Sequence, residues 1–191
     1  EKDSIVLNTN EHSRAGLGIE SRDLRMARQF LDRYPLHSFH RLATMFHDLR
    51  AVKSTAEVNI IRDAIAITKH GLDKVLSHLK PGVKEYELEA ELIGEFTRQR
   101  ATMGYEPIVA SGKNACTLHY INNNGPCQDG DLLLIDVGAN HANYTADVTR
   151  VFPVSGRFTP RQKELYQAVL RVLQSSIERT VVGATLSQWK W

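Results

Sequence analysis

The sequence predicts an α+β domain whose helices pack on one face of a largely antiparallel sheet. Three observations support this fold class. Apolar residues recur at helical spacing up to Met103, strand-like runs separated by Gly, Asn, Pro and Asp follow, and a capped helical stretch comes last. Helices and strands grouped in separate blocks favour this class over alternating α/β units. A hydrophobic share of 42% is sufficient for a globular core.

Five stretches are predicted as helices, the second by the weakest pattern: residues 21–34, 37–49, 54–80, 85–103 and 159–183. Two of them have clear start signals. Ser54 and Glu57 form an S-x-x-E capping box, and Thr159 is a predicted N-cap with Pro160 at the first helical position. The predicted strands are residues 108–110, 118–121, 132–138 and 144–152. Residues 1–52 are interpreted as the end of a preceding domain and a linker.

An aspartate lies inside the most apolar stretch of the chain. Residues 131–138 are typical of a strand buried on both faces, yet they include Asp136, and aspartate is rarely buried without a partner. Asp147 lies in the next predicted strand. A turn over residues 140–143 would centre the hairpin between His141 and Ala142. That centre places Asp136 and Asp147 directly opposite each other, with their side chains on one face.

Two facing carboxylates repel each other, and a divalent cation between them would remove the conflict. Oxygen ligands suit Mn²⁺ or Mg²⁺, and Zn²⁺ or Co²⁺ become possible if an imidazole joins. Asp136 and Asp147 are therefore candidate metal ligands. A structural interpretation stays open, in which one aspartate pairs with Arg150 or caps a turn. A turn of different length would also change the register.

His119 is the candidate catalytic residue. It lies near the end of a predicted strand, just before the turn formed by residues 122–125, and strand ends are where ligands are often bound. A single histidine beside a tyrosine can equally be a hydrogen-bonded structural residue.

Charge and composition argue against several classes of partner. The net charge of +2 comes from 24 basic and 22 acidic residues, and no basic block exceeds two residues, which predicts neither nucleic-acid nor membrane-surface binding. No apolar run approaches the roughly 20 residues of a membrane span. No leader pattern opens the chain, and Cys116 and Cys127 match no metal or disulfide spacing, so we expect reduced thiols and a cytoplasmic location. Without an initiator Met, the chain is interpreted as a fragment or a processed form.

Three runs of sequence carry a family resemblance: Leu118-His119-Tyr120, Ile135-Asp136-Val137-Gly138-Ala139, and residues 144–154. Together with the residues around Ser54, they resemble the pita-bread metallopeptidases, and within them aminopeptidase P and its relative prolidase. The resemblance covers about residues 45–173. It implies the first half of a pita-bread domain over residues 53–191.

The resemblance also implies roles for the three candidate residues. Asp136 would bind one ion of a dinuclear site, usually manganese, and Asp147 would bridge both ions. His119 would contact the substrate near the scissile bond. The implied reaction is removal of an N-terminal residue that precedes proline, so the implied partner is a peptide with proline in the second position. Two metal ions can activate water, polarise the peptide carbonyl and bind the free amine.

The chain departs from the family in what it lacks. The family's second half supplies a histidine and two glutamate ligands, and this sequence ends at Trp191 without them. We therefore expect a partial chain that is inactive alone. The open edge of a half-built sheet favours pairing with another chain or aggregation. We also expect a homo-oligomer. The alternatives are prolidase and a non-catalytic pita-bread binding module.

Overall fold

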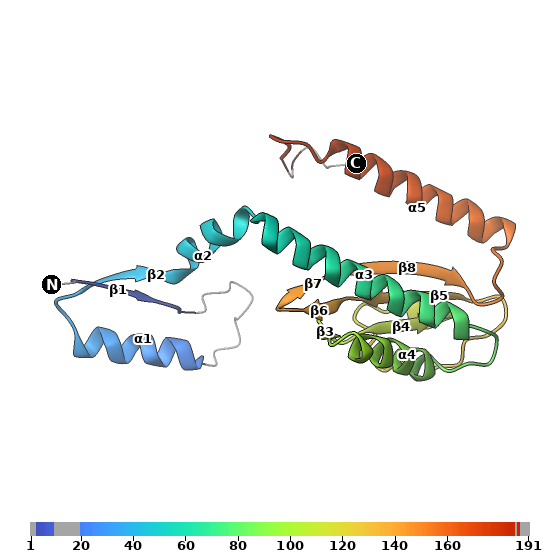
Figure 1. Ribbon diagram of the computed structural model, residues 1–191, viewed down its shortest axis with the longest axis horizontal. Helices are drawn as coiled ribbons and strands as arrows, with labels where there is room; N and C mark the ends of the chain where they lie inside the picture. The colour runs from blue at the N-terminus through green and yellow to red at the C-terminus, as the bar shows by residue number, and fades with distance from the viewer. Residues whose placement is uncertain (1–2, 10–19, 186, 188–191) are drawn as a thin grey trace. The chain divides into compact units, whose positions relative to one another are not determined.

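The computed structural model describes residues 3–9, 20–185 and 187 (Figure 1). The chain divides into two compact units, Glu1–Val58 and Asn59–Trp191. Among the described residues, no helix is both long and apolar enough to cross a bilayer. Cys116 is exposed and Cys127 is buried, and both are free thiols.

The first unit contains a short parallel strand pair, β1 (Ser4–Leu7) and β2 (Ser38–Arg41), with the helices α1 (Arg22–Arg33) and α2 (Leu42–Ala51). The predicted helix over residues 21–34 is confirmed, with Ser21 as its N-cap. The prediction of one helix over residues 37–49 is wrong at its start, because residues 38–41 pair with β1 instead. Strand pairing decides such short stretches more than local propensity does.

The helices that follow are α3 (Thr55–His78), α4 (Glu85–Arg98) and, after the strands, α5 (Pro160–Arg179). Both predicted helix start signals are confirmed. The Glu57 side chain accepts from the Ser54 amide at 2.7 Å, and Thr159 caps the Gln162 amide at 3.3 Å. The predicted extension of α4 to Met103 is wrong, because the chain leaves the helix at Arg100, whose φ is 58°.

The strands form two small antiparallel sheets. One has the order β4 (Ile108–Ser111), β5 (Leu132–Val137) and β8 (Val148–Pro153), and the other has the order β3 (Thr102–Met103), β6 (Ala139–His141) and β7 (Tyr144–Thr145). The strand predicted over residues 118–121 is wrong. That segment is a turn that follows a 3₁₀ helix, η1 (Gly112–Cys116).

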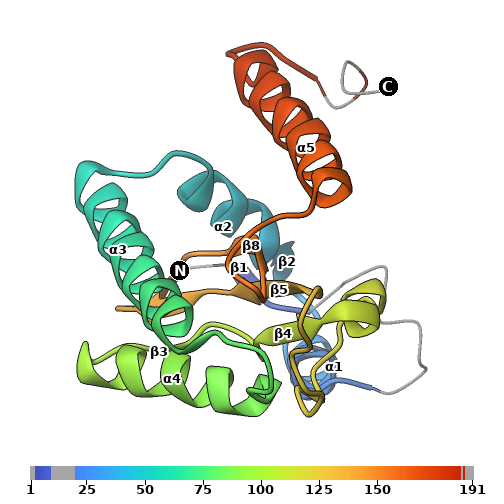
Figure 2. The ribbon, with the colours of Figure 1, turned by 90° about the vertical axis from the view of Figure 1, so that its right-hand side faces the viewer.

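The helices α3 and α4 cover one face of the β4-β5-β8 sheet (Figure 2). Their buried side chains meet alternate residues of β5 in one core, which includes Val75, Leu88, Leu92, Phe96, Leu133, Ile135 and Val137. The α+β prediction with helices on one sheet face is confirmed.

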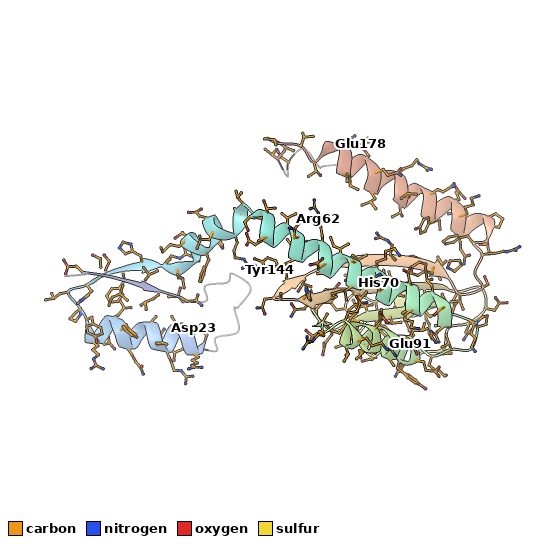
Figure 3. The ribbon with its side chains drawn as sticks, in the orientation of Figure 1. Asp23, Arg62, His70, Glu91, Tyr144 and Glu178 are labelled. Atoms are coloured by element: carbon orange, nitrogen blue, oxygen red, sulfur yellow. The ribbon has the colours of Figure 1, made fainter. Side chains whose placement is uncertain are left out.

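At the rim of the α3–α4 helix pair, away from the core, the ring nitrogen of His78 lies 3.8 Å from the carboxylate of Glu91, which Figure 3 labels on α4.

The opposite face of β5 is less buried. Leu133, Ile135 and Val137 are fully buried, whereas residues 132, 134 and 136 are only partly so. The prediction of a strand buried on both faces is therefore wrong, since only the face toward α3 and α4 is covered completely. Asp136 lies on the more open face, and this placement gives its carboxylate access to solvent and ligands.

Candidate metal centre

The hairpin that carries both aspartates turns one residue later than predicted. His141 pairs with Tyr144, and the two turn residues Ala142 and Asn143 have φ angles of 48° and 67°. Positive φ at both central residues is the signature of a type I′ turn, which suits the twist of a two-residue hairpin. The register therefore places Asp136 opposite Thr149, and the predicted direct pairing of Asp136 with Asp147 is wrong.

The two carboxylates nevertheless reach the same place. A shift of the hairpin centre by one residue changes each pairing by two residues, which keeps every side chain on its predicted face. Asp147 lies between β7 and β8, where the strand predicted over residues 144–152 is interrupted. The two strands of the hairpin lie very close together at Gly138 and Ala146. Only glycine fits at position 138, because a Cβ there would lie 1.7 Å from the Ala146 carbonyl oxygen.

One phenol joins the two aspartates. The Tyr105 hydroxyl lies 2.8 Å from Asp136 Oδ1 and 3.1 Å from Asp147 Oδ1. It can donate its single hydrogen to only one of them at a time, so the two oxygens converge on one donor. Partial burial, followed by hydrogen bonding to Asp136 and the charges of both carboxylates, raises the pKa of Tyr105 far above its usual range. The phenol is therefore a permanent donor at neutral pH.

His119 faces the same cavity. A pocket of about 470 Å³ is lined by Asp136, Asp147 and His119 together with Tyr105, Glu106, Ile108 and Ile121. All three predicted site residues thus line one cavity. His119 is exposed and has a φ of 53°, in the left-handed region that residues other than glycine seldom adopt, although Asn, Asp and His adopt it more often than the rest. Strained backbone of this kind is often found at functional sites.

The alternative roles considered for the aspartates find no support in the described residues. Neither Asp136 nor Asp147 forms an ion pair there, and the Arg150 guanidinium instead donates to the Thr149 carbonyl oxygen at 2.8 Å. Asp131, in the turn before β5, accepts from the Gln128 amide at 3.2 Å. Asp136 and Asp147 remain two acidic groups that share a single neutral donor.

Comparison with known proteins gives the family. The sequence profile of metallopeptidase family M24 matches residues 59–190, more than half of the chain. The chain belongs to metallopeptidase family M24. It is 41% identical over 145 residues to the Xaa-Pro aminopeptidase of Haemophilus influenzae and 42% identical over 141 residues to that of Escherichia coli. These alignments cover 75% and 73% of the chain, but only 34% and 32% of the two relatives.

Solved structures of M24 relatives share the fold. Aminopeptidase PepP of Pseudomonas aeruginosa superposes with a TM-score of 0.81 at 34% identity, over 93% of this chain and 40% of that one. Proline aminopeptidase P II of Yersinia pestis gives a TM-score of 0.77 at 34% identity, over 91% of this chain and 40% of that one. The pita-bread fold expected from the sequence is confirmed. The chain spans about a third of the length of the curated relatives that it matches.

M24 enzymes use a divalent metal, and the donor chemistry of this site fits such an ion in part. Carboxylate oxygens are good ligands for hard divalent cations, and the two carboxylates that converge here line one cavity. Within residues 3–9, 20–185 and 187, however, no group of three or more His, Cys, Asp or Glu side chains is placed to hold a metal. The described residues thus offer two carboxylates as candidate ligands, fewer than the three or more side chains of such a group.

Tyr105 is the site residue that sequence reasoning missed. It follows Gly104, in the connection between β3 and β4 where no periodic pattern applies. Its closeness to Asp136 arises because β3 pairs with β6 while β4 pairs with β5. Only the pairing of strands distant in the sequence brings this phenol to the carboxylates, so no local signal reveals it.

Replacing Tyr105 by Phe is expected to lower the free energy of unfolding of the metal-free chain by about 1–2 kcal/mol at pH 7. The loss follows because a hydrogen bond to a charged group contributes about 1.5–3 kcal/mol, and the cavity lets water replace part of it. Urea unfolding of the wild type, Tyr105→Phe and the control Tyr86→Phe measures it. Tyr86 is exposed on α4, so its variant should match the wild type. Equal stability of all three proteins would show that the phenol does not hold the carboxylates.

Proposed function

We propose that this chain is part of an Xaa-Pro aminopeptidase, an enzyme that removes the residue preceding a proline at the N-terminus of a peptide. The observation that supports this most is the convergence of Asp136 and Asp147 on one donor in a cavity that His119 also lines. The relatives carrying the name Xaa-Pro aminopeptidase add the substrate class. Membership of family M24 alone supports only a metal-dependent hydrolysis of peptides, without a substrate preference.

Each site residue has a proposed role. Asp136 and Asp147 would hold the divalent ions, which we propose are two Mn²⁺, with Co²⁺ or Zn²⁺ as substitutes. When bound, the metal pair supplies Lewis-acid polarisation of the peptide carbonyl and lowers the pKa of water. Tyr105 orients the two carboxylates, since its hydroxyl lies within hydrogen-bond distance of both. His119 contacts the peptide close to the scissile bond, since its imidazole is exposed on the wall of the same cavity.

The proposal extends to organisation and location. Residues 1–52 are the end of a preceding domain and a linker, and residues 53–191 are the first half of the pita-bread domain. The remaining ligands come from the second half, so the 191-residue chain is inactive alone. The full protein is a cytoplasmic homo-oligomer that acts on peptides. Nucleic acid and membranes are not partners.

A chimera tests the proposed reaction without requiring the chain to act alone. Residues 59–173 replace the corresponding segment of the Escherichia coli Xaa-Pro aminopeptidase, which is 42% identical over 141 residues. With Mn²⁺, we expect the chimera to cleave an Xaa-Pro tripeptide at least about 100-fold faster than the matched Xaa-Ala tripeptide, because a pocket shaped for proline gains several kcal/mol of selectivity. The isolated chain should cleave neither.

Three outcomes would contradict the proposal. A metal-loaded, folded chimera that hydrolyses Xaa-Pro dipeptides but no tripeptide would indicate prolidase. Equal rates with both tripeptides would show that the enzyme has no preference for proline. Absence of hydrolysis in a folded chimera that binds two Mn²⁺ per chain would favour a non-catalytic module. Mass spectrometry of the bound metal distinguishes this last case from simple loss of the metal.

A further inference from the structure

One carboxylate is completely buried and has no part in the site described so far. Glu85 is the first residue of α4 and has an exposed fraction of 0%. Burying a carboxylate is costly unless hydrogen bonds replace its water shell. Glu85 has four such partners. Its Oε1 accepts from the Ser111 amide at 2.7 Å and from Asn114 Nδ2 at 2.9 Å.

The second oxygen accepts equally short bonds from the other end of the same segment. Oε2 accepts from the Tyr120 hydroxyl at 2.8 Å and from the Gly125 amide at 2.7 Å. The Glu85 amide also donates to the Gly125 carbonyl oxygen at 2.9 Å. Charge-assisted bonds of this length are among the stronger hydrogen bonds in proteins. One side chain therefore fixes the segment 111–125 at four positions along its length.

His119 lies inside this segment, directly before Tyr120. Its φ of 53° is a strained conformation that persists only when the surrounding structure enforces it. Among the described residues, no hydrogen bond holds the imidazole itself. The position of His119 on the cavity wall is therefore set by the backbone, and the backbone is held on both sides by the partners of Glu85.

We propose that Glu85 is a positioning residue that acts on His119 through the segment 111–125, and this inference rests on the proposed role of His119 in peptide cleavage. The carboxylate does not touch the cavity or the two aspartates. It fixes the strained backbone that aims the imidazole at the peptide. The segment has little regular structure of its own after η1, so its conformation depends on this buried anchor.

The chemistry of the anchor requires a carboxylate and not an amide. Both oxygens of Glu85 accept from two donors each. Glutamine in either orientation would direct an NH₂ group at two donors and lose two of the four bonds. Glu87 offers a matched control on the same turn of α4. It is exposed and, within the described part of the chain, accepts one hydrogen bond, from the Lys84 amide, which a glutamine oxygen can also accept.

NMR of the metal-free chain tests the geometry directly. The ¹³Cα and ¹³Cβ shifts and the one-bond Cα–Hα coupling of His119 report the sign of its φ. In the wild type and in Glu87→Gln we expect His119 shifts and a coupling typical of positive φ (left-handed values), together with slow exchange of the Ser111 and Gly125 amides. In Glu85→Gln we expect averaged values at His119 and at least tenfold faster exchange of these two amides, with the resonances of the Val109 and Leu133 methyl groups unchanged.

A milder variant covers the case in which Glu85→Gln does not fold. Tyr120→Phe removes one of the four donors beside His119 and should shift the same His119 parameters part of the way. Left-handed values at His119 retained in both variants, or retained in Tyr120→Phe when Glu85→Gln is unfolded, would overturn the proposal.

The active chimera supplies a second and separate measurement. Glu85→Gln is expected to lower its kcat at least tenfold while the bound Mn²⁺ and KM stay within threefold of the parent chimera. An unchanged kcat would overturn the positioning role. If the parent chimera itself has no activity, the proposed function fails, whereas the metal-free NMR result still decides whether Glu85 holds His119.

Discussion

Replacing Asp136 by Asn is expected to lower the kcat/KM of the Mn²⁺-loaded chimera by at least about 1000-fold, because a neutral amide oxygen is a poor ligand and metal assistance contributes several kcal/mol to such hydrolysis. The same variant should bind measurably less Mn²⁺ per chain by mass spectrometry. In the isolated, metal-free chain, its unfolding free energy should stay within about 0.5 kcal/mol of the wild type. The amide oxygen can still accept from Tyr105, and the repulsion between two carboxylates is removed.

The control for this experiment is Asp129→Asn. Asp129 is exposed just before β5, outside the cavity, and its variant makes the same chemical change. We expect it to keep the activity and the metal content of the parent chimera. If Asp136→Asn destabilised the metal-free chain strongly and left metal binding intact, the aspartate would be a structural residue and the proposed metal role would be wrong.

Replacing Gly138 by Ala is expected to destabilise the isolated chain by about 3 kcal/mol or more, close to the upper end of overpacking penalties. The new Cβ would lie 1.7 Å from the Ala146 carbonyl oxygen, and that oxygen belongs to backbone that cannot turn away as a side chain could. The Gly138 carbonyl also accepts from the Gly104 amide at 2.8 Å, so any shift disturbs the connection to Tyr105. Urea unfolding measures the loss.

Gly94→Ala is the matched control, for which we expect a change in stability of the opposite sign. Gly94 lies within α4, and a Cβ there would meet only the flexible end of Arg98, at 3.6 Å or more. Alanine in a helix interior is favoured over glycine by about 1 kcal/mol, so this variant should gain stability. A Gly138→Ala protein as stable as the wild type would mean that the two halves of the hairpin are farther apart than the structure places them.

Helix starts were predictable because their signals are local. Ser54, Glu57 and Thr159 form the caps expected from their spacing, and each cap involves residues only three apart. The ends were less predictable. The helix over residues 85–98 stops early because residues 102–103 pair with β6, and the helix expected over residues 37–49 begins late because residues 38–41 pair with β1. Such pairings depend on segments far away in the sequence.

Three residues that line the candidate site were predictable from the sequence, whereas Tyr105 and the geometry of the site were not. An aspartate in an apolar strand was sufficient to single out Asp136, and the hairpin then indicated Asp147. The register was wrong because the turn is Ala142–Asn143, a choice that depends on which residues accept positive φ. The segment that carries His119 was predicted as a strand, since its apolar residues resemble one. The buried Glu85 that organises this segment is 26 residues or more from each donor.

The alternating burial of β5 separates two kinds of evolutionary constraint along one strand. Leu133, Ile135 and Val137 are constrained by packing in the core beneath α3 and α4, whereas Asp136 is constrained by its place in the cavity on the other side. Selection for a folded protein and selection for chemistry therefore act on adjacent residues with little interference. A lineage could exchange or discard the ligands on the open face and keep the scaffold, so that new activities arise without rebuilding the domain.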